Sequence, residues 1–137
     1  MMISSRGRYA LRVMIDLAEH QSDEYIPMKI VAKRQGISLK YLEQILPVLS
    51  KNNLIEGVHG KGGGYRLCRP AKYYTVGEIL KLTEGTLAPV TCLVGGDNPC
   101  PNGAHCKSYA VWTKLNDIIN DYLDGVSLTD VVEGNVD

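Results

Sequence analysis

The chain has 137 residues, of which 45% are apolar and 22% are charged. This composition is ordinary for a soluble globular protein and excludes a disordered chain. The longest stretch without a charged side chain, residues 85–96, is far shorter than the ~20 residues of a membrane-spanning helix. Charges at Arg6, Arg8 and Arg12 interrupt any apolar signal-peptide core, so we expect a cytoplasmic protein with no membrane partner.

The formal net charge is zero, but the charges are unevenly distributed. Residues 1–72 carry twelve Lys and Arg against six Asp and Glu, whereas residues 73–137 carry three against nine. A basic half beside an acidic half indicates that one part meets a polyanion and the other does not. Two solvated faces with no partner would give the same distribution, so charge alone leaves both interpretations open.

Three helical patterns occupy the first part of the chain. Apolar residues three and four apart predict a helix over residues 7–20, a second over residues 27–35, and a third after Ser38. Gly36 allows a tight turn before the third helix, and Ser38 is expected to cap it by accepting a hydrogen bond from a free backbone N–H. Pro47 should kink or loosen the third helix. Two short helices joined by a glycine-containing turn are typical of a helix-turn-helix.

The segment after the third helix predicts a β-hairpin with a long glycine-rich tip. Apolar residues over 54–58 lead into five residues, 60–64, that contain four glycines, and an alternating pattern resumes at Tyr65. A strand rather than a helix follows the glycines, and no Gly-Lys-Ser/Thr ends them, so a nucleotide-binding phosphate loop is excluded. A hairpin directly after a recognition helix is a wing, and we expect its tip to carry His59, Lys61 and Arg66.

The outward residues of the third helix suit the edges of DNA bases. Lys40 and Gln44 share one face; glutamine can make two hydrogen bonds to adenine, and lysine can reach guanine or a phosphate. Glu43 can accept from cytosine or repel phosphates. Each residue taken alone could be an exposed side chain without a partner, but the order of helix, turn, helix and basic wing favours DNA. The predicted DNA contacts are Arg6, Arg8, Lys29, Ser38, Lys40, Tyr41, Glu43, Gln44, His59 and Lys61.

Three of the four cysteines, Cys92, Cys100 and Cys106, lie close together in a glycine- and proline-rich stretch. Disulfides explain them poorly, because three thiols cannot pair off and the cytoplasm keeps thiols reduced. Soft thiolates select zinc, copper or an iron–sulfur cluster. The gaps are wider than the close pairs of structural zinc sites and favour a cluster, with zinc and a bare thiol sensor as alternatives. His105 is a possible fourth ligand, whereas Cys68 is expected to be a small structural residue of the second wing strand.

The acidic half predicts helices of a different kind. Residues 75–78 have a capping-box pattern, and the helix they open should end at Gly85. Apolar residues recur at helical spacing from about 108 to 123 and give a wide stripe. The stripe either packs on its own chain or pairs with a second copy, and we prefer pairing because two half-sites increase affinity for DNA. No nucleophile–base pair or paired carboxylates are recognisable, so an enzyme is not expected.

These predictions combine into a mainly α fold with a small β-wing. Residues 1–72 would form the winged helix-turn-helix domain, and residues 73–91 a connecting helix and linker. Residues 92–106 would form the cysteine loop, and residues 107–137 a long dimerisation helix with a C-terminal tail. The expected partners are an operator in double-stranded DNA and a second copy of the chain.

Three segments, residues 5–10, 37–46 and 60–65, together resemble the IscR/NsrR/CymR family of bacterial winged-helix transcription regulators. The likeness runs from Ser5 to about Val132, and the cysteines followed by a Trp-containing helix are similar to the cluster-bearing, IscR-like members. It implies a homodimer whose iron–sulfur cluster, 2Fe–2S or 4Fe–4S, sets operator affinity through its presence, redox state or reaction with nitric oxide. It also implies cluster ligation by Cys92, Cys100 and Cys106, and groove contacts by residues 38–44 and by His59 and Lys61.

Two positions depart from the family pattern. Tyr109 stands where the IscR pattern has a histidine, three residues after its last cysteine. Arg8 occupies the place where some NsrR-like members have an acidic ligand. The resemblance therefore leaves the fourth ligand and the cluster type open.

Overall fold

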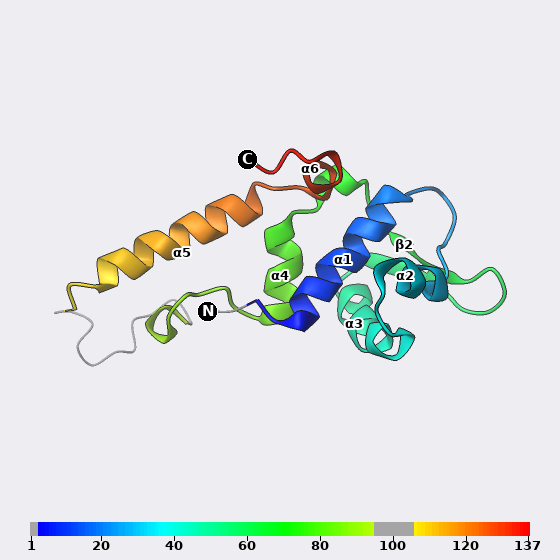
Figure 1. Ribbon diagram of the computed structural model, residues 1–137, viewed down its shortest axis with the longest axis horizontal. Helices are drawn as coiled ribbons and strands as arrows, with labels where there is room; N and C mark the ends of the chain where they lie inside the picture. Colours follow the sequence, from blue (N-terminus) through cyan, green and yellow to red (C-terminus); the bar gives the residue numbers. More distant parts are fainter. Residues whose placement is uncertain (1–2, 95–105) are drawn as a thin grey trace.

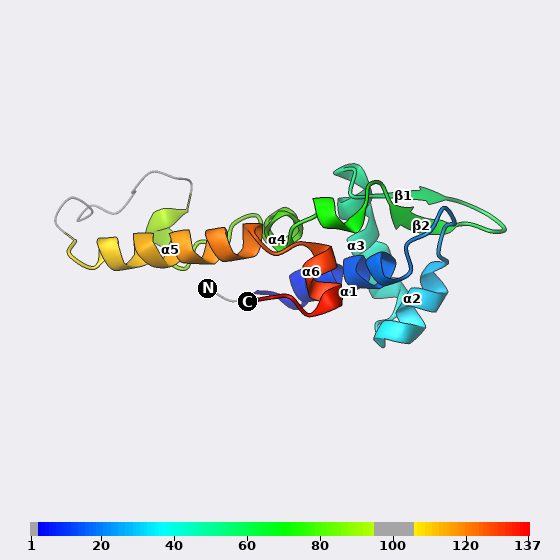
Figure 2. The same ribbon diagram turned by 90° about the horizontal axis from the view of Figure 1, so that it is seen from above.

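The computed structural model describes residues 3–94 and 106–137. In chain order its elements are α1 (Ser5–Glu19), α2 (Met28–Gln35), α3 (Leu39–Lys51), β1 (Ile55–Val58), β2 (Gly64–Leu67), the 3-10 helix η1 (Ala71–Tyr73), α4 (Val76–Glu84), the 3-10 helix η2 (Thr91–Leu93), α5 (Tyr109–Asp124) and α6 (Leu128–Glu133). Figures 1 and 2 show α1–α4 and α6 gathered into one body. The wing projects from one end of this body, and α5 extends away from the other.

The predicted helices form, with small changes at their ends. Ser4 caps α1, where its hydroxyl accepts a hydrogen bond from the Gly7 N–H at 3.2 Å, so the helix begins two residues earlier than expected. Helix α2 ends at Gly36, whose φ of 64° is left-handed and lets the chain turn toward α3. Helix α3 remains helical on both sides of Pro47. The turn and the cap thus place α3 as the second helix of a helix-turn-helix.

The main core lies between α1 and α3. Helix α1 buries Ala10, Val13, Met14 and Leu17, and α3 buries Leu42, Ile45, Leu46 and Leu49. Each large apolar side chain buried here stabilises the fold by about 1.5–3 kcal/mol. This core also takes in Tyr74, Ile79 and Leu128 from the second half of the chain. Helix α3 is therefore packed on a scaffold that includes α4 and α6.

The wing is an antiparallel pair that is also tied to the connection between α1 and α2. Its register pairs Ile55 with Leu67 and Val58 with Gly64. Ile26 and Tyr65 exchange two backbone hydrogen bonds of 2.9 Å. A side chain at position 64 would collide with the backbone of Ile26, so glycine is needed for this close approach. These bonds fix the tip-side end of β2 to the connection between α1 and α2.

Helices α4 and α6 are capped by hydroxyl groups. Thr75 accepts from the Glu78 N–H at 3.0 Å, but the structure gives no reciprocal bond from the Glu78 carboxylate, which binds Arg69 instead. Only half of the capping box expected from the sequence therefore forms. A full box does form at α6, between Ser127 and Asp130. Among the residues that the structure describes, no helix has the length and apolar character to cross a membrane.

Candidate nucleic-acid interface and cysteine segment

Helix α3 presents a polar face opposite its buried one. The Ser38 hydroxyl accepts from the Tyr41 N–H at 3.1 Å, which satisfies one free donor of the first turn. Lys40, Glu43 and Gln44 are all exposed, because the apolar residues of the helix occupy the other side. Tyr41 is half-buried, and its ring packs edge-on against Tyr9 of α1 with 5.3 Å between centroids. The face can therefore make hydrogen bonds from a helix that is held rigidly on α1.

The tip of the wing is exposed and carries two basic side chains. His59 and Lys61 are both exposed on the loop between β1 and β2. Gly60 and Gly62 have φ values of 91° and 79°, a conformation that favours glycine. The Gly63 N–H donates to the Gly60 carbonyl at 2.9 Å, which closes the turn. Small residues here let the backbone come close to a phosphate or a groove wall.

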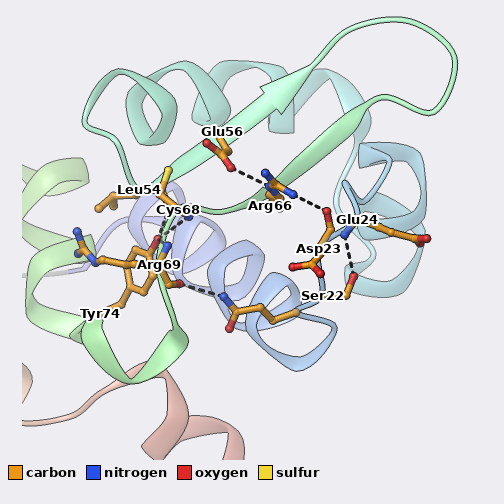
Figure 3. A network of polar contacts seen from close by, with 10 residues as sticks. Ser22, Asp23, Glu24, Leu54, Glu56, Arg66, Cys68, Arg69 and Tyr74 are labelled. Atoms are coloured by element: carbon orange, nitrogen blue, oxygen red, sulfur yellow. Dashed lines mark hydrogen bonds and ion pairs between the residues drawn. The ribbon is translucent and has the colours of Figure 1, made fainter.

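Arg66, which was expected at the tip, lies at the base of the wing. Its Nε donates to Glu56 Oε1 on the paired strand at 2.7 Å, and a second nitrogen donates to the Asp23 carbonyl (Figure 3). The guanidinium also lies 4.3 Å from the centre of the Tyr25 ring. The Glu56 carboxylate raises the pKa of Arg66, so the group stays charged. Arg66 is thus committed to holding the wing against the loop before α2.

A buried tyrosine anchors the end of β2, and the sequence analysis did not single it out. The Tyr74 hydroxyl donates to the Leu54 carbonyl at 2.6 Å and accepts from the Cys68 and Arg69 N–H groups (Figure 3). Arg69 lies over the Tyr74 ring at 4.1 Å and makes two hydrogen bonds to the Glu78 carboxylate. Burial raises the pKa of Tyr74, so its hydroxyl keeps its proton. The base of the wing is thereby joined to α4.

A buried carboxylate joins α1 to α2, and this feature was also missed. Asp16 is 1% exposed and accepts hydrogen bonds from Arg34 Nε at 3.0 Å, from Arg34 Nη2 at 2.6 Å and from the Gln35 amide at 2.9 Å. Burial alone would raise the pKa of Asp16, but these hydrogen bonds and the Arg34 charge outweigh it and lower the pKa. Arg12 of α1 also donates to the Gln35 side chain at 3.2 Å. The residue just before the turn is therefore fixed to α1 from two sides.

The remaining predicted DNA contacts lie on the first two helices. Arg6 and Arg8 are exposed in the first turns of α1, where Arg8 Nη2 donates to the Ser5 hydroxyl at 3.1 Å. Lys29 is exposed in the first turn of α2. All three cations are accessible to a phosphate.

Two of the three clustered cysteines fall in the described part of the chain. Cys92 is half-buried in η2, and Cys106 is exposed just before α5. The Ser108 hydroxyl lies 3.1 Å from the Cys106 sulfur and lowers the pKa of this thiol. Cys100 and His105 lie outside the described residues. Within residues 3–94 and 106–137, no group of three His, Cys, Asp or Glu side chains is placed to hold a metal ion.

Cys68 does not have the structural role expected for it. The residue follows β2 and is exposed rather than packed in the wing. Partial burial of its sulfur and the charge of Glu56 raise the pKa of the thiol. The alternation of apolar residues ends at Leu67, which takes the last inward position of the strand.

The apolar stripe of α5 is exposed. No residue of this helix is buried. Val111 is 59% exposed and Ile118 is 53% exposed, and Leu115 lies between them on the same face. At the other end of α5, Asp124 receives two hydrogen bonds from Lys81 of α4, at 2.8 and 3.0 Å. Helix α5 is therefore attached at its C-terminal end and leaves an apolar surface uncovered.

Comparison with known proteins gives this arrangement a family. A sequence profile of the Rrf2 family, described as an iron-dependent transcriptional regulator, matches residues 3–134. The transcriptional regulator IscR of Pectobacterium carotovorum is 36% identical over 132 residues, which cover 96% of this chain and 79% of that protein. IscR of Photorhabdus laumondii is 37% identical over the same shares of the two chains.

Solved structures of regulators have the same fold. CymR, the global cysteine regulator of Bacillus subtilis, superposes with a TM-score of 0.82 at 29% identity and 97% coverage of both chains. IscR of T. potens superposes with a TM-score of 0.78 at 32% identity, covering 98% of this chain and 88% of that one. These relatives are transcription regulators, in agreement with the expectation that the chain is not an enzyme. The winged helix-turn-helix and the match over nearly the whole length place this chain in the Rrf2 family of transcriptional regulators.

Proposed function

We propose that the chain acts as a homodimer that reads an operator in double-stranded DNA with α3 and the wing. The observation that carries this proposal is the polar face of α3. Its Lys40, Glu43 and Gln44 are exposed on a helix whose other side is locked into the core. A helix of this kind fits the major groove, where side-chain hydrogen bonds distinguish the base pairs.

Separate groups of residues would supply specificity and affinity. Gln44 would pair with adenine, Lys40 with guanine or a phosphate, and Glu43 with the amino group of cytosine. The wing would bring His59 and Lys61 to the adjacent groove or backbone. The phosphate contacts would come from cations and capping groups on the first three helices, Arg6, Arg8, Lys29, Ser38 and Tyr41.

The dimer would form through α5. Its uncovered apolar residues Val111, Leu115 and Ile118 are of the kind that a second copy buries in a symmetric interface. Two reading heads joined in this way contact two half-sites about one helical turn apart. In this proposal the winged helix-turn-helix domain ends at residue 72, the connecting helix and linker at residue 91 and the cysteine loop at residue 106, after which the dimerisation helix follows.

An iron–sulfur cluster would be held by Cys92, Cys100 and Cys106, and would set the affinity for the operator. The donor set fits such a group, because iron–sulfur clusters take thiolates and the Cys106 thiol is exposed with a lowered pKa. When bound, the cluster would supply a centre that responds to iron supply, oxidants or nitric oxide. The chain's own residues would transmit this state, because Cys106 lies three residues before the start of α5 and Cys92 lies in the segment that follows α4. His105 is a candidate for the fourth ligand. The spectra and the iron and sulfide contents would distinguish a 2Fe–2S from a 4Fe–4S cluster.

Salt dependence of duplex binding tests the DNA-reading part. With about six phosphate contacts, the logarithm of the binding constant should fall against the logarithm of salt concentration with a slope near −5. Lys40→Ala and Lys61→Ala should each reduce the slope by about one. Lys72→Ala is the matched control, because Lys72 lies in η1, which packs on α6. Binding that ignores salt would refute the proposal and favour a protein-interaction module.

Elemental analysis and visible spectra of protein prepared without oxygen test the cluster. The parent should be brown and contain iron and sulfide, whereas a triple Cys→Ala variant at positions 92, 100 and 106 should contain neither. Cys68→Ala is the matched control and should keep the colour, since Cys68 follows β2 at the base of the wing. Zinc in place of iron would overturn the cluster, and colour retained by the triple variant would overturn the ligand assignment.

A further inference from the structure

The last residue of α4 contacts the first turn of α1. Glu84 Oε1 accepts a hydrogen bond from the Ser4 N–H at 3.1 Å and another from the Ser4 hydroxyl at 2.5 Å. The same hydroxyl oxygen accepts from the Gly7 N–H at 3.2 Å. Two elements that are eighty residues apart in sequence are joined here through one carboxylate.

Gly7 makes room for this carboxylate. Gly7 is buried, and a Cβ at this position would lie against Glu84 Oε1 and Thr83 Oγ1. Its neighbours Arg6 and Arg8 are both exposed. The glycine between two arginines thus has a physical reason: the backbone at position 7 receives Glu84, while the side chains on each side point to solvent.

The charge of Glu84 has two opposite consequences for DNA binding. A carboxylate is favourable at the N-terminus of a helix, where it satisfies free N–H groups and the helix dipole. A negative charge beside Arg6 and Arg8 also repels phosphates, so Coulomb's law alone makes Glu84 unfavourable for DNA binding. If Glu84 promotes binding, it does so through geometry.

The other charged residues of α4 favour the geometric role. Glu78 binds Arg69 at the base of the wing, and Lys81 binds Asp124 of α5. Glu78, Lys81 and Glu84 are spaced three residues apart, so one short helix is fixed in turn to the wing, to α5 and to α1. The first turn of α1 is therefore held in a defined position relative to the wing.

We propose that Glu84 is a positioning residue for DNA binding, which holds Arg6 and Arg8 of α1 in register with the wing on the phosphate backbone. The inference rests on the proposed function, in which these arginines contact phosphates. It gives α4 a role in DNA binding, although α4 itself is not proposed to contact the DNA.

Replacement of Glu84 in the full chain tests the sign of its effect. The probe is a fluorescein-labelled duplex enriched from a random-sequence pool by the parent chain, with anisotropy as the readout. Glu84→Ala should weaken binding roughly three- to tenfold and flatten the salt dependence. Glu84→Gln, which keeps the acceptor oxygen, should recover part of the affinity. Glu133→Ala removes the same charge from the exposed end of α6 and should leave the affinity unchanged or slightly tighter.

A second pair of variants separates positioning from general damage to the fold. Gly7→Ala should displace the carboxylate and weaken binding to a similar degree, although alanine favours a helix more than glycine does. In a chain with Arg6→Ala and Arg8→Ala, Glu84→Ala should cause little further loss, because the positioned groups are gone. All melting temperatures must remain well above the assay temperature. An equal loss in both backgrounds would show a merely structural role.

The two proposals fail in different ways. If the parent chain binds no duplex, or if Arg6→Ala and Arg8→Ala leave binding unchanged, the phosphate contacts of the proposed function are wrong and the role of Glu84 is wrong with them. If the parent binds and loses affinity with those arginines, but Glu84→Ala binds as tightly or more tightly, only the positioning role is overturned.

Discussion

The basic and acidic halves of the molecule differ in how their apolar residues are covered. In the basic half, α1 and α3 each bury four apolar side chains, which pack against one another and against α4 and α6. In the acidic half, α5 buries none of its residues, and Val111 and Ile118 are more than half exposed. The apolar core of the winged helix-turn-helix is therefore covered within one chain, whereas the apolar face of α5 is left exposed. An exposed apolar face of this kind is the surface that the proposed homodimer would bury.

The halves also differ in their polar groups. The basic half contains a buried carboxylate, Asp16, which accepts three hydrogen bonds. Its wing is anchored by the buried hydroxyl of Tyr74, which lies just beyond residue 72 and also makes three hydrogen bonds. Such groups fix one arrangement of the helices, because any shift would leave a buried polar atom unpaired. In the acidic half, the pair of Lys81 and Asp124 is largely exposed and stabilises the fold much less.

The largest expected effect comes from charging the apolar face of α5. A double variant, Leu115→Glu with Ile118→Glu, should convert a dimer to monomers and weaken operator binding about a thousandfold, because the second half-site no longer adds to the first. Sedimentation and anisotropy measure both changes. Tyr73→Glu with Val132→Glu adds the same charge at exposed positions outside α5 and should do neither. A double α5 variant that remains dimeric would remove the contrast between the halves.

Removal of the buried carboxylate should be the next largest effect. Asp16→Ala should lower the free energy of unfolding by about 3 kcal/mol, because it breaks a buried ion pair and leaves the Gln35 amide without its acceptor. Glu56→Ala breaks the solvent-screened pair with Arg66 and should cost much less than the loss of Asp16. Denaturant titration measures both values. Equal costs would show that burial of Asp16 adds nothing to the bond.

The same carboxylate predicts a pH dependence. The folded-state pKa of Asp16 is lowered from its ordinary value of 3.8. The ion pair therefore contributes its full stability above that value and loses it as the pH falls through the lower, folded-state pKa. The difference in melting temperature between the parent and Asp16→Asn should shrink in this acidic range. A difference that stays constant down to full protonation would contradict the lowered pKa.

Loss of one buried hydroxyl should have a smaller effect. Tyr74→Phe leaves the Leu54 carbonyl and two N–H groups of the chain after β2 without their partner, which should cost about 2 kcal/mol. Tyr73→Phe is the matched control, because Tyr73 is 60% exposed. Thermal unfolding compares the two variants. A neutral Tyr74→Phe would mean that water replaces the hydroxyl.

The smallest expected effect concerns one base pair. Gln44→Ala should relax the preference at a single operator position and cost about 1–3 kcal/mol there, while leaving binding to sequences that already lack the preferred base nearly unchanged. Competition among duplexes that differ at one position measures it. An equal loss on every sequence would show that Gln44 positions the helix and does not read a base.

Local patterns predicted the helices and the wing well. The start of α3, the cap at Ser38 and the exposed set around Gln44 follow from a repeat of 3.6 residues and from the chemistry of the hydroxyl group. Cys68 was misassigned because the alternating pattern does not show that β2 ends at Leu67, and Arg66 was grouped with the tip although it lies inside β2. Nothing near them in the sequence shows where β2 ends or that Glu56 lies opposite Arg66.

The sequence by itself determined the order of elements, the polar face of α3, the glycine-rich tip of the wing and the three clustered thiols. Only the tertiary structure decided that Asp16 is buried with Arg34, that Tyr74 anchors the end of β2, and that Glu84 meets Ser4. The physical reason is range. Helix periods, caps and turns depend on neighbours within a few residues, whereas a buried ion pair or a capping carboxylate from another helix exists only after the core has brought distant segments together.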